Sequence, residues 1–491
     1  MSRPNILWYC SDRQRFDTIR SMGNPLVRTP NIDRLVERGV GFARAYCQTP
    51  VCTPSRATFL TGQYPATHHI HRNGNDHVPP ETRLVTKILQ EAGYDCGLIG
   101  KLHLARSQGT FEKRTDDGYR FFQWSHHPTP DLPERHDYAD WLANEKGVDP
   151  QELYAPLMGI LYGPGLPEEY SQTTWCTEMA MRFISEKRDG PWMLSVNPFD
   201  PHPPFDPPRE YLDHYDPSEM PYPLFREEDI ERQRAFARVD QQTMEAINPY
   251  EAEKGITSEW GERYDGYPGR ETPKGYDARK VKACYYASVE LVDHQLGRIL
   301  TFLEERGELE NTIVLFHSDH GEILGDHGLL GLACRFFESL VRVPMVVSWP
   351  SRFQTGLKSQ ALVELVDLAP TLLEAAGLEA PGSMQGKSLV PLLTGRTDPH
   401  VHKPRVICDY NDALDQPNGS HGTMYFDGRH KSVVYHDRNL GELYDMQEDP
   451  GEFQNLWDDP AAAGIKCDVL TRHFNALMLS SGAGVERTAS Y

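Results

Sequence analysis

One short stretch of the sequence, Val51 to Gly62, places a cysteine and an arginine at the expected start of a helix. It reads VCTPSRATFLTG. Cys52 alone could be a disulfide partner, a metal ligand, a thiolate nucleophile or a buried core thiol, and a single cysteine is most often the last of these. A helix start carries free backbone N–H groups that attract anions. Together with Arg56, this position therefore suits a negatively charged ligand.

Further polar side chains stand directly after predicted strands. They are, in chain order, Asp12, Lys101 with His103, Asn197 to His202, and Asp319 with His320. In open α/β sheets, ligands bind in the crevice beyond the carboxyl ends of the strands. Carboxylate and imidazole donors suit Ca²⁺, Mn²⁺ or Zn²⁺. The pattern predicts one divalent metal beside an anion.

Each of these residues also has an ordinary structural explanation. An aspartate after a strand, such as Asp12, is usually a turn or cap residue. The segment SDHGEILGDHG around Asp319 is dense in Asp, His and Gly but could be only a turn. Prolines could simply hold His202 in NPFDPHPPF, and Lys101 could be a solvated surface residue. Taken one at a time, these residues do not decide between a ligand-binding site and a structural role.

The elements that must position these residues alternate along the chain. Predicted strands cover 5–10, 94–99, 192–196, 312–316 and 343–349; predicted helices run from Thr29-Pro30 to Gly39, from Thr82 to Gly93, and over 173–186, 278–305 and 362–376. Strands that alternate with helices predict an α/β fold, with a mostly parallel central sheet between helical layers.

Three regions depart from this alternation. Residues 105–170 and 203–275 are rich in Pro, Tyr, Asp and Glu, and we expect surface excursions that shape a substrate entrance or the subunit contact of a homo-oligomer. From about residue 400 the pattern changes to hairpin-like pieces at 423–426, 432–435 and 442–445. We therefore predict a catalytic domain over 1–400 and a small α+β subdomain over 401–491, built on an antiparallel sheet with a last helix.

The composition excludes several classes of partner. The chain has 491 residues, with 71 acidic against 50 basic side chains, which argues against a nucleic-acid or anionic-membrane surface. No apolar run approaches the roughly 18 residues of a spanning helix, and MSRPNILWYCSD carries no secretory signal, so the predicted location is cytoplasmic. Nine scattered cysteines without a CxxC pair predict neither a disulfide framework nor a structural zinc site.

Taken together, the motifs resemble one known pattern. Cys52-Thr53-Pro54-Ser55-Arg56, continued by Leu60-Thr61-Gly62, is similar to the signature of the type I, formylglycine-dependent sulfatases of the alkaline phosphatase superfamily. The resemblance continues in order through PNILWYCSDRQRFDTI, TPNIDRLVERGVGF, GLIGKLHLA, SDHGEILGDHGLLG and ELYDMQEDPGEFQNL, and so spans nearly the whole chain.

The resemblance implies a function and a cofactor. In that family the cysteine of C-x-P-S-R is oxidised to formylglycine, so a formylglycine-generating enzyme would act on Cys52 during maturation. The mature enzyme would hydrolyse a small sulfate monoester. The residues that match the family's metal ligands are Asp12, the modified Cys52, Asp319 and His320, and they would hold one Ca²⁺ or Mn²⁺ ion.

The same resemblance assigns roles around the metal. Arg56 and Lys101 would orient the hydrated aldehyde and the sulfate oxygens. His103 resembles the base of the second step. His202 resembles the residue that protonates the departing alcohol or contacts the sulfate, and Asn73 matches a polar contact in the substrate site.

Three positions depart from the family pattern. Arg13 follows Asp12 where many sulfatases have a second aspartate, and Asp319-His320 replaces a frequent Asp-Asn, which favours Mn²⁺ somewhat over Ca²⁺. Leu332 stands where a lysine is usual, and Arg335 is the candidate to replace that cation. Two alternatives stay open: a phosphonate monoester or phosphodiester hydrolase of the same superfamily, and a non-catalytic anion-binding relative.

Overall fold

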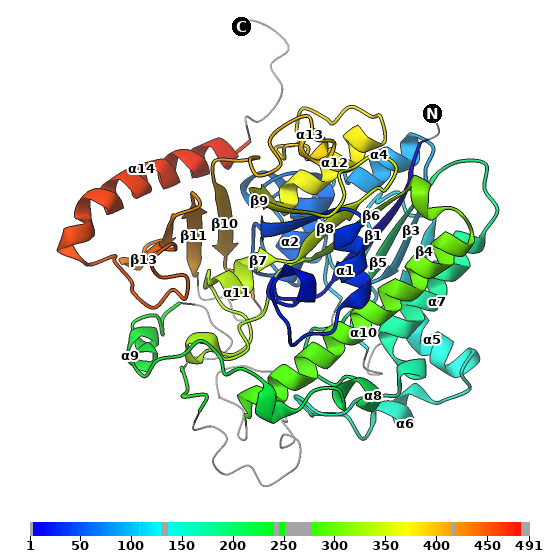
Figure 1. The fold of residues 1–491 in the computed structure, drawn as a ribbon, viewed down its shortest axis with the longest axis horizontal. Coiled ribbons are helices and arrows are strands. Elements are labelled where there is room, and N and C mark those ends of the chain that lie inside the picture. The colour runs from blue at the N-terminus through cyan, green and yellow to red at the C-terminus, as the bar shows by residue number, and fades with distance from the viewer. Residues whose placement is uncertain are drawn as a thin grey trace, which may run out of the picture.

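A nine-stranded sheet runs through the larger part of the molecule, and helices cover both of its faces (Figure 1). The computed structural model describes residues 3–107, 109–128, 136–239, 245–250, 276–414 and 419–482. The strands of this sheet are β1 (Asn5–Ser11), β2 (Val40–Tyr46), β3 (Asp95–Gly100), β4 (Phe121–Trp124), β5 (Trp192–Asn197), β6 (Thr312–Ser318), β7 (Arg342–Val343), β8 (Met345–Ser348) and β9 (Leu357–Glu364).

The half of this sheet that carries the predicted site is parallel. Its order is β4-β3-β5-β1-β6-β8-β2-β7, with β9 paired to β2. All neighbours from β4 to β6 are parallel, whereas β8 runs antiparallel to β6 and β2. The mostly parallel α/β sheet predicted from the sequence is thus confirmed, and the carboxyl ends of five neighbouring strands meet at one edge.

Helices cover both faces of this sheet, while the last one in the chain packs on a second sheet. They are α1 (Pro30–Glu37), α2 (Cys52–Thr61), α3 (Pro65–His68), α4 (Val85–Glu91), α5 (Asp137–Asn144), α6 (Pro150–Tyr154), α7 (Gln172–Ser185), α8 (Arg209–Leu212), α9 (Glu228–Arg234), α10 (Ala278–Glu305), α11 (Glu338–Val341), α12 (Leu368–Ala375), α13 (Val390–Leu393) and α14 (Ala463–Ser480). Strand β1 alternates between two cores: Ile6 and Trp8 pack with α2, α4 and α12, while Leu7 and Tyr9 pack with α1, α7 and α10.

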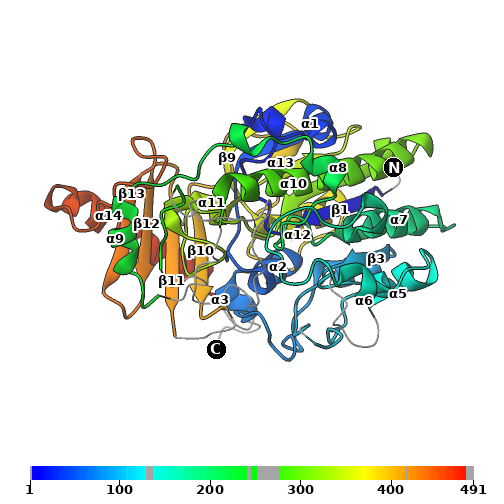
Figure 2. The ribbon, with the colours of Figure 1, turned by 90° about the horizontal axis from the view of Figure 1, so that it is seen from below.

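A second, four-stranded sheet follows in the chain and lies beside the first (Figures 1 and 2). Its strands β10 (Val406–Asn411), β11 (His421–Phe426), β12 (His430–Tyr435) and β13 (Leu440–Asp445) pair consecutively and antiparallel. Helix α14 buries Val469 and Ala476 against this sheet. The antiparallel C-terminal architecture is confirmed, while the boundary between residues 400 and 401 stays a prediction.

Some element boundaries differ from the sequence prediction. Helix α4 begins at Val85, not at Thr82. The predicted helix over 362–376 contains the end of β9 and then α12, because a buried strand runs directly into an apolar helix and the two share one unbroken apolar pattern. The predicted strand over 343–349 is split into β7 and β8.

Helix α1 begins at Pro30 as predicted, but its cap comes from elsewhere in the fold. The side chain of Thr29 makes no capping hydrogen bond. Instead, the Asp293 carboxylate on α10 accepts the backbone N–H groups of Asn31 and Ile32, at 3.2 and 2.7 Å. A residue more than 260 positions away therefore satisfies the free donors of this helix.

The two predicted excursions contain mainly short helices, but residues 105–170 also contain β4, an edge strand of the large sheet that the sequence did not predict. Helices α5 and α6 lie in 105–170, and α8 and α9 lie in 203–275. Residues 108, 129–135, 240–244 and 251–275 of these excursions lie outside the described residues. Among the described residues, no helix has the length and apolar character needed to cross a bilayer.

Candidate metal and anion site

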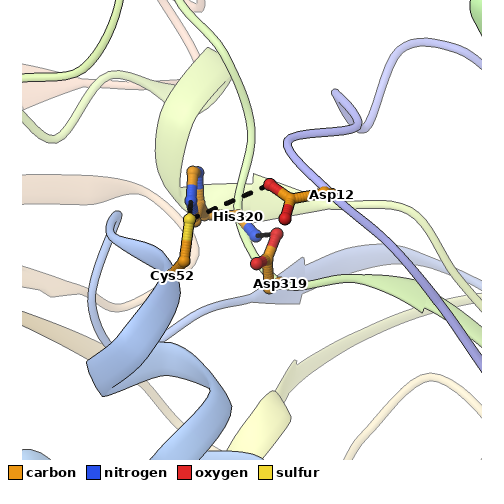
Figure 3. Close-up of side chains that lie close together, drawn as sticks. All are labelled: Asp12, Cys52, Asp319 and His320. Carbon is orange, nitrogen blue, oxygen red and sulfur yellow. Dashed lines mark hydrogen bonds between the residues drawn. The ribbon is translucent and has the colours of Figure 1, made fainter. Parts of the chain in front are cut away.

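Four side chains that could ligate a metal meet at the carboxyl edge of the large sheet (Figure 3). Strands β1 and β6 are parallel neighbours with Ser11 opposite Ser318, so the residues that follow them, Asp12 and Asp319, come together. His320 is next in the chain, and Cys52 is the first residue of α2. One ligand atom from each of the four lies within 4.8 Å of the others, and all four side chains are buried.

Two buried cations surround these carboxylates. The Arg56 Nη2 atom lies 3.1 Å from Asp12 Oδ2 and 2.9 Å from Asp319 Oδ2. The Lys101 Nζ atom lies 2.6 Å from Asp12 Oδ2 and 3.6 Å from Cys52 Sγ. Cys52 and Arg56 are one helical turn apart, so α2 presents both to the same edge. The spacing C-x-x-x-R thus places the Cys52 sulfur and the Arg56 guanidinium beside the carboxylates of Asp12 and Asp319.

The electrostatics favour ionised groups in the cluster. Burial by itself would raise the pKa of Asp319, but Arg56, His320 and Lys101 outweigh it and hold that pKa below its usual range. Burial acts to lower the pKa of His320, but the Asp319 carboxylate and the Cys52 sulfur outweigh this effect and raise the pKa to about 9. An ionised carboxylate that several cations already stabilise is an oxygen donor suited to a hard metal ion.

The start of α2 is fixed by a residue from a distant loop. Asn73 Oδ1 accepts the backbone N–H of Thr53 at 3.0 Å, and the Asn73 N–H donates to the Ala413 carbonyl at 3.0 Å. The structure therefore brings Asn73 to the residue that follows Cys52. Its observed contact is with the backbone of the helix start.

Gly100, directly before Lys101, allows β3 to pack closely against β5. Gly100 has φ +92°, and a Cβ atom there would lie 2.1 Å from the Asn197 carbonyl oxygen. Without a side chain, β3 can approach β5, and the Lys101 N–H bonds that same carbonyl at 3.0 Å. The Asn197 amide in turn donates to the Lys101 carbonyl at 2.8 Å. The glycine of GLIGKLHLA is thus a requirement of strand packing.

His103 follows β3 and is held in a left-handed backbone conformation. The Glu112 carboxylate accepts the N–H groups of His103, Leu104 and Ala105 at 2.5 to 3.0 Å, which fixes the loop. The His103 ring packs edge-on against His126, with 4.3 Å between centroids. Burial, with His126 and Lys101, lowers the pKa of His103 well below its usual value. A neutral imidazole at this position can accept a proton.

His202 lies after β5 and packs on an aromatic ring. Its ring centroid is 4.3 Å from that of Phe199, and Lys101 Nζ lies 5.5 Å from the same Phe199 ring. Burial, with the charges of Arg13 and Lys101, lowers the pKa of His202. Neutral His202 donates its Nδ1–H to the Pro203 carbonyl at 2.6 Å, which leaves Nε2 as the acceptor.

The contacts that Arg335 makes are with residues other than those of the metal and anion site. Its guanidinium pairs with Glu442 at 3.0 Å, donates to the Tyr435 hydroxyl at 2.8 Å, and stacks 4.0 Å from the Phe236 ring. These partners belong largely to the second sheet. The predicted replacement of the lysine missing at Leu332 therefore has no support from the geometry of Arg335.

Sequence reasoning missed two residues next to the cluster. Arg13, which was seen only as a departure from the family pattern, forms a buried ion pair with Glu322 at 2.9 Å, two residues beyond His320. His126 follows the short strand β4, which the sequence did not predict. Arg13 is adjacent to Asp12, but its partner Glu322 lies 309 positions further along the chain, so no local pattern predicts the pair.

A model of one known family matches most of the chain. The model described as Sulfatase matches residues 4–378. The chain belongs to the sulfatase family. A second model, described as the C-terminal part of N-sulphoglucosamine sulphohydrolase, matches residues 325–478. The resemblance drawn from the sequence motifs is thereby confirmed, and with it the assignment as an enzyme of this family.

The similar proteins include an arylsulfatase, a multifunctional relative and a phosphonate monoester hydrolase. An arylsulfatase of Clostridium perfringens is 29% identical over 92% of this chain and 90% of its own length. A multifunctional alkaline phosphatase superfamily protein of Trinickia caryophylli is 29% identical over 95% and 94%. The crystal structure of the phosphonate monoester hydrolase of Agrobacterium radiobacter superposes with a TM-score of 0.80, 26% identity and coverage of 98% and 96%.

Proposed function

We propose that this protein hydrolyses a sulfate monoester to an alcohol and inorganic sulfate, with residue 52 as the nucleophile. The observation that carries this proposal is the position of the Cys52 side chain. Its Sγ atom lies 3.2 Å from His320 Nε2, 3.6 Å from Lys101 Nζ and 3.8 Å from Asp12 Oδ1. A nucleophile among metal-ligand atoms and fixed cations can approach an anionic ester without charge repulsion.

The donor set fits one divalent cation. Two carboxylates, one imidazole and the side chain of residue 52 converge on a common point. Hard oxygen donors suit Ca²⁺ or Mn²⁺, and the imidazole of His320 favours Mn²⁺ of these two. When bound, the cation would neutralise sulfate oxygens and lower the pKa of a hydroxyl at residue 52.

We infer that Cys52 is converted to formylglycine, whose hydrate has two hydroxyls on one carbon. When present, this hydrate would supply one hydroxyl that displaces the alcohol from sulfur, losing its own proton to solvent, and a second hydroxyl whose deprotonation would release the sulfate and restore the aldehyde. Arg56 and Lys101 hold the residue and the sulfate oxygens during both steps. A serine would lack the second hydroxyl.

The two histidines would move the protons. His103 is neutral, because its pKa is lowered by burial and by His126 and Lys101, so it can accept the proton of the second hydroxyl. His202 would protonate the departing alcohol, which requires its imidazolium form. The negative charge of a bound sulfate ester opposes the charges of Arg13 and Lys101 and raises the pKa of His202 towards that form.

A phosphonate monoester or phosphodiester hydrolase is the second candidate. The Agrobacterium radiobacter hydrolase has a similar fold, and the Trinickia caryophylli relative is described as multifunctional. Leu332 in place of a lysine also removes one cation that a sulfatase site usually has. Lys101 beside Cys52 Sγ, together with His103, favours the sulfate ester.

Purified wild-type protein tests both candidates. We expect the specificity constant to be larger for an aryl sulfate than for the matching aryl phosphonate monoester. The reverse preference would reject the sulfatase proposal in favour of the second candidate. Removal of metal by a chelator should abolish turnover, and Mn²⁺ or Ca²⁺ should restore it.

Mass spectrometry of the peptide that spans Cys52 tests the modification. Protein from its native host should show the mass loss that accompanies conversion of a thiol to an aldehyde. The peptide of a Cys52→Ala variant from the same host is the matched control and should show no such loss. An intact thiol in wild-type protein, together with no turnover, would favour a non-catalytic anion-binding protein.

A further inference from the structure

Arg13 stands directly after the metal-ligand candidate Asp12, in a backbone conformation that arginine rarely adopts. Its φ is +58°, in the left-handed region. Two contacts from distant elements hold it there. The Arg13 N–H donates to Asp319 Oδ1 at 3.1 Å, and the Tyr285 hydroxyl on α10 donates to the Arg13 carbonyl at 2.6 Å. Strained backbone that the surrounding fold holds in place clusters at functional sites.

The Arg13 side chain reaches the segment that carries His320. Its Nη1 atom lies 2.9 Å from Glu322 Oε2, and both side chains are buried. The other Glu322 oxygen accepts the backbone N–H of Ile323 at 2.9 Å, which fixes the carboxylate. Glu322 therefore holds the guanidinium in one place, two residues beyond a metal-ligand candidate.

The loop of Arg13 also lies beside the segment that carries His202. The Asp12 N–H donates to the Asp200 carbonyl at 3.2 Å, so the two loops run next to each other. Burial is the first cause that lowers the pKa of His202, and the charge of Arg13 is the second. Arg13 is also among the charges that act on the pKa of His320. The guanidinium thus lies where its charge reaches both the expected leaving-group histidine and the metal-ligand candidate.

The charge of the site points to a role for this guanidinium. Leu332 removes a cation that the sulfatase pattern usually has, and Arg335 pairs with Glu442 of the second sheet. Arg13 stands where many sulfatases have a second aspartate, so it exchanges a negative charge for a positive one. Fixed cations that face the oxygens of an anionic ester stabilise its bound and reacting forms. Arg13 can therefore supply the charge that is lost at Leu332.

We propose that Arg13 binds an oxygen of the ester's anionic group, and that Glu322 is the positioning residue that aims its guanidinium. This inference rests on the proposed hydrolysis of an anionic ester at residue 52. A guanidinium has five N–H donors in a rigid fork, so it can bind Glu322 and an ester oxygen at the same time. Arg56 on α2 and Lys101 after β3 are the other two cations, and Arg13 adds a third from the end of β1.

Arg15 provides a matched control in the same loop. Its Nη1 atom lies 2.8 Å from Asp326 Oδ2, and both side chains are buried. Its backbone N–H donates to the Tyr285 hydroxyl at 2.8 Å, the same hydroxyl that holds Arg13. Its second carboxylate partner is Asp17, at 2.9 Å. Arg15 thus matches Arg13 in burial and in ion-pair distance but has no part in the proposed anion contact.

Two double variants test the proposal. Each removes a buried ion pair whole, so neither leaves an uncompensated charge. Arg13→Met with Glu322→Gln should raise KM for the ester, and the inhibition constant of inorganic sulfate, by about tenfold or more, because one charge-assisted hydrogen bond is lost. The value of kcat should change less than KM. Arg15→Met with Asp326→Asn should keep both constants near the wild-type values. Equal increases in the two double variants would overturn the proposal.

Single variants separate anion binding from a purely structural role. Arg13→Met should raise KM and also lower the thermal stability, because Glu322 is left buried without its cation. Adding Glu322→Gln should recover stability while KM stays raised. Arg13→Lys keeps the charge but loses the fork, so it should recover part of the KM effect. If KM returns to the wild-type value together with stability in the double variant, Arg13 serves only the fold and the proposal is wrong.

The choice of ester distinguishes this inference from the proposed sulfatase reaction. If wild type prefers the aryl phosphonate monoester, the sulfatase proposal fails, and the same comparison of KM is made on that substrate. If wild type turns over neither ester, calorimetric titration with inorganic sulfate and with inorganic phosphate replaces the kinetics. Weaker binding in Arg13→Met with Glu322→Gln, but not in Arg15→Met with Asp326→Asn, supports the contact. Equal binding in all three proteins, or none in wild type, rejects it.

Discussion

Two buried groups of charges lie in this protein, and they differ in whether their donor atoms converge on one common centre. The first is the site cluster, whose charged side chains are Asp12, Arg56, Lys101, Asp319 and His320. The second, which we call the inter-sheet cluster, lies between the two sheets and consists of Arg335, Glu338, Lys431, Glu442 and Glu452. In the inter-sheet cluster the Lys431 Nζ atom lies 3.1 Å from Glu338 and 2.8 Å from Glu452, and tyrosine hydroxyls donate to the glutamates.

The two clusters resemble each other in burial and in ion-pair distance. They differ in where the remaining donor atoms point. In the site cluster the carboxylates also share one centre with the Cys52 sulfur and the His320 imidazole (Figure 3). Donor atoms that converge on one point indicate a ligand, whereas charges that face only each other contribute to the stability and specificity of the fold. Burial and pairing alone therefore do not distinguish a catalytic group from a structural one.

The largest expected effect is that of Cys52→Ala in the site cluster. Removal of the nucleophile should lower kcat/KM for an aryl sulfate by about 10⁴-fold or more. The free energy of unfolding should change little, because one sulfur atom is lost and the ion pairs remain. Steady-state kinetics and urea unfolding measure the two effects. Full activity in the Cys52→Ala variant would contradict a catalytic role for the site cluster and so remove its difference from the inter-sheet cluster.

Arg335→Met should have the opposite profile. Loss of the guanidinium leaves Glu442 buried without its cation, which should lower the free energy of unfolding by about 3–5 kcal/mol. Arg335 lowers the pKa of Glu442 against the effect of burial. The native pair therefore stabilises above the unfolded pKa of about 4.3 and loses this contribution as the pH falls through the lowered folded value, so the difference between variant and wild type should shrink in acid.

The double variant Arg335→Met with Glu442→Gln is the control for this prediction. It removes the uncompensated charge and should recover part of the stability. A variant with unchanged stability and a raised KM would instead show that Arg335 binds substrate.

The buried lysines Lys101 and Lys431 form a matched pair. Lys101→Met should lower kcat/KM by about 10²–10³-fold, since one cation is lost from the transition state. Lys431→Met should leave the activity of the folded enzyme intact and should lower the free energy of unfolding, because Glu338 and Glu452 lose their shared cation. Kinetics and urea unfolding of both variants make the comparison. Equal losses of activity in Lys101→Met and Lys431→Met would contradict the proposed difference between the two clusters.

The smallest effect is expected for His202→Ala and should depend on the leaving group. With an alkyl sulfate, whose alcohol needs a proton, the rate should fall about 10²-fold. With nitrophenyl sulfate, whose leaving group is stable as an anion, it should fall only a few-fold. A pH series with the alkyl substrate should show wild-type activity declining as the pH rises, because His202 must be protonated to act. Equal losses on both substrates would assign His202 to binding alone.

Much of the fold and of the site could be predicted because the signals are local. The strand over 5–10, the position of Asp12 after it and the helix start at Cys52 all follow from short patterns of apolar and polar residues. Strand β9 was missed because its buried end continues without interruption into α12. Strand β4, with four residues, is too short for a pattern, and so His126 was missed with it.

The sequence by itself determined which polar residues follow strand ends and helix starts, and so which edge of a parallel sheet they share, since these ends and starts are set by neighbours in the chain. Only the tertiary structure decided which charges meet. Asp293 caps α1, Glu322 pairs with Arg13, and Glu442 of the second sheet pairs with Arg335. An ion pair forms wherever the fold brings opposite charges together out of water, and the partners here lie 107 to 309 positions apart.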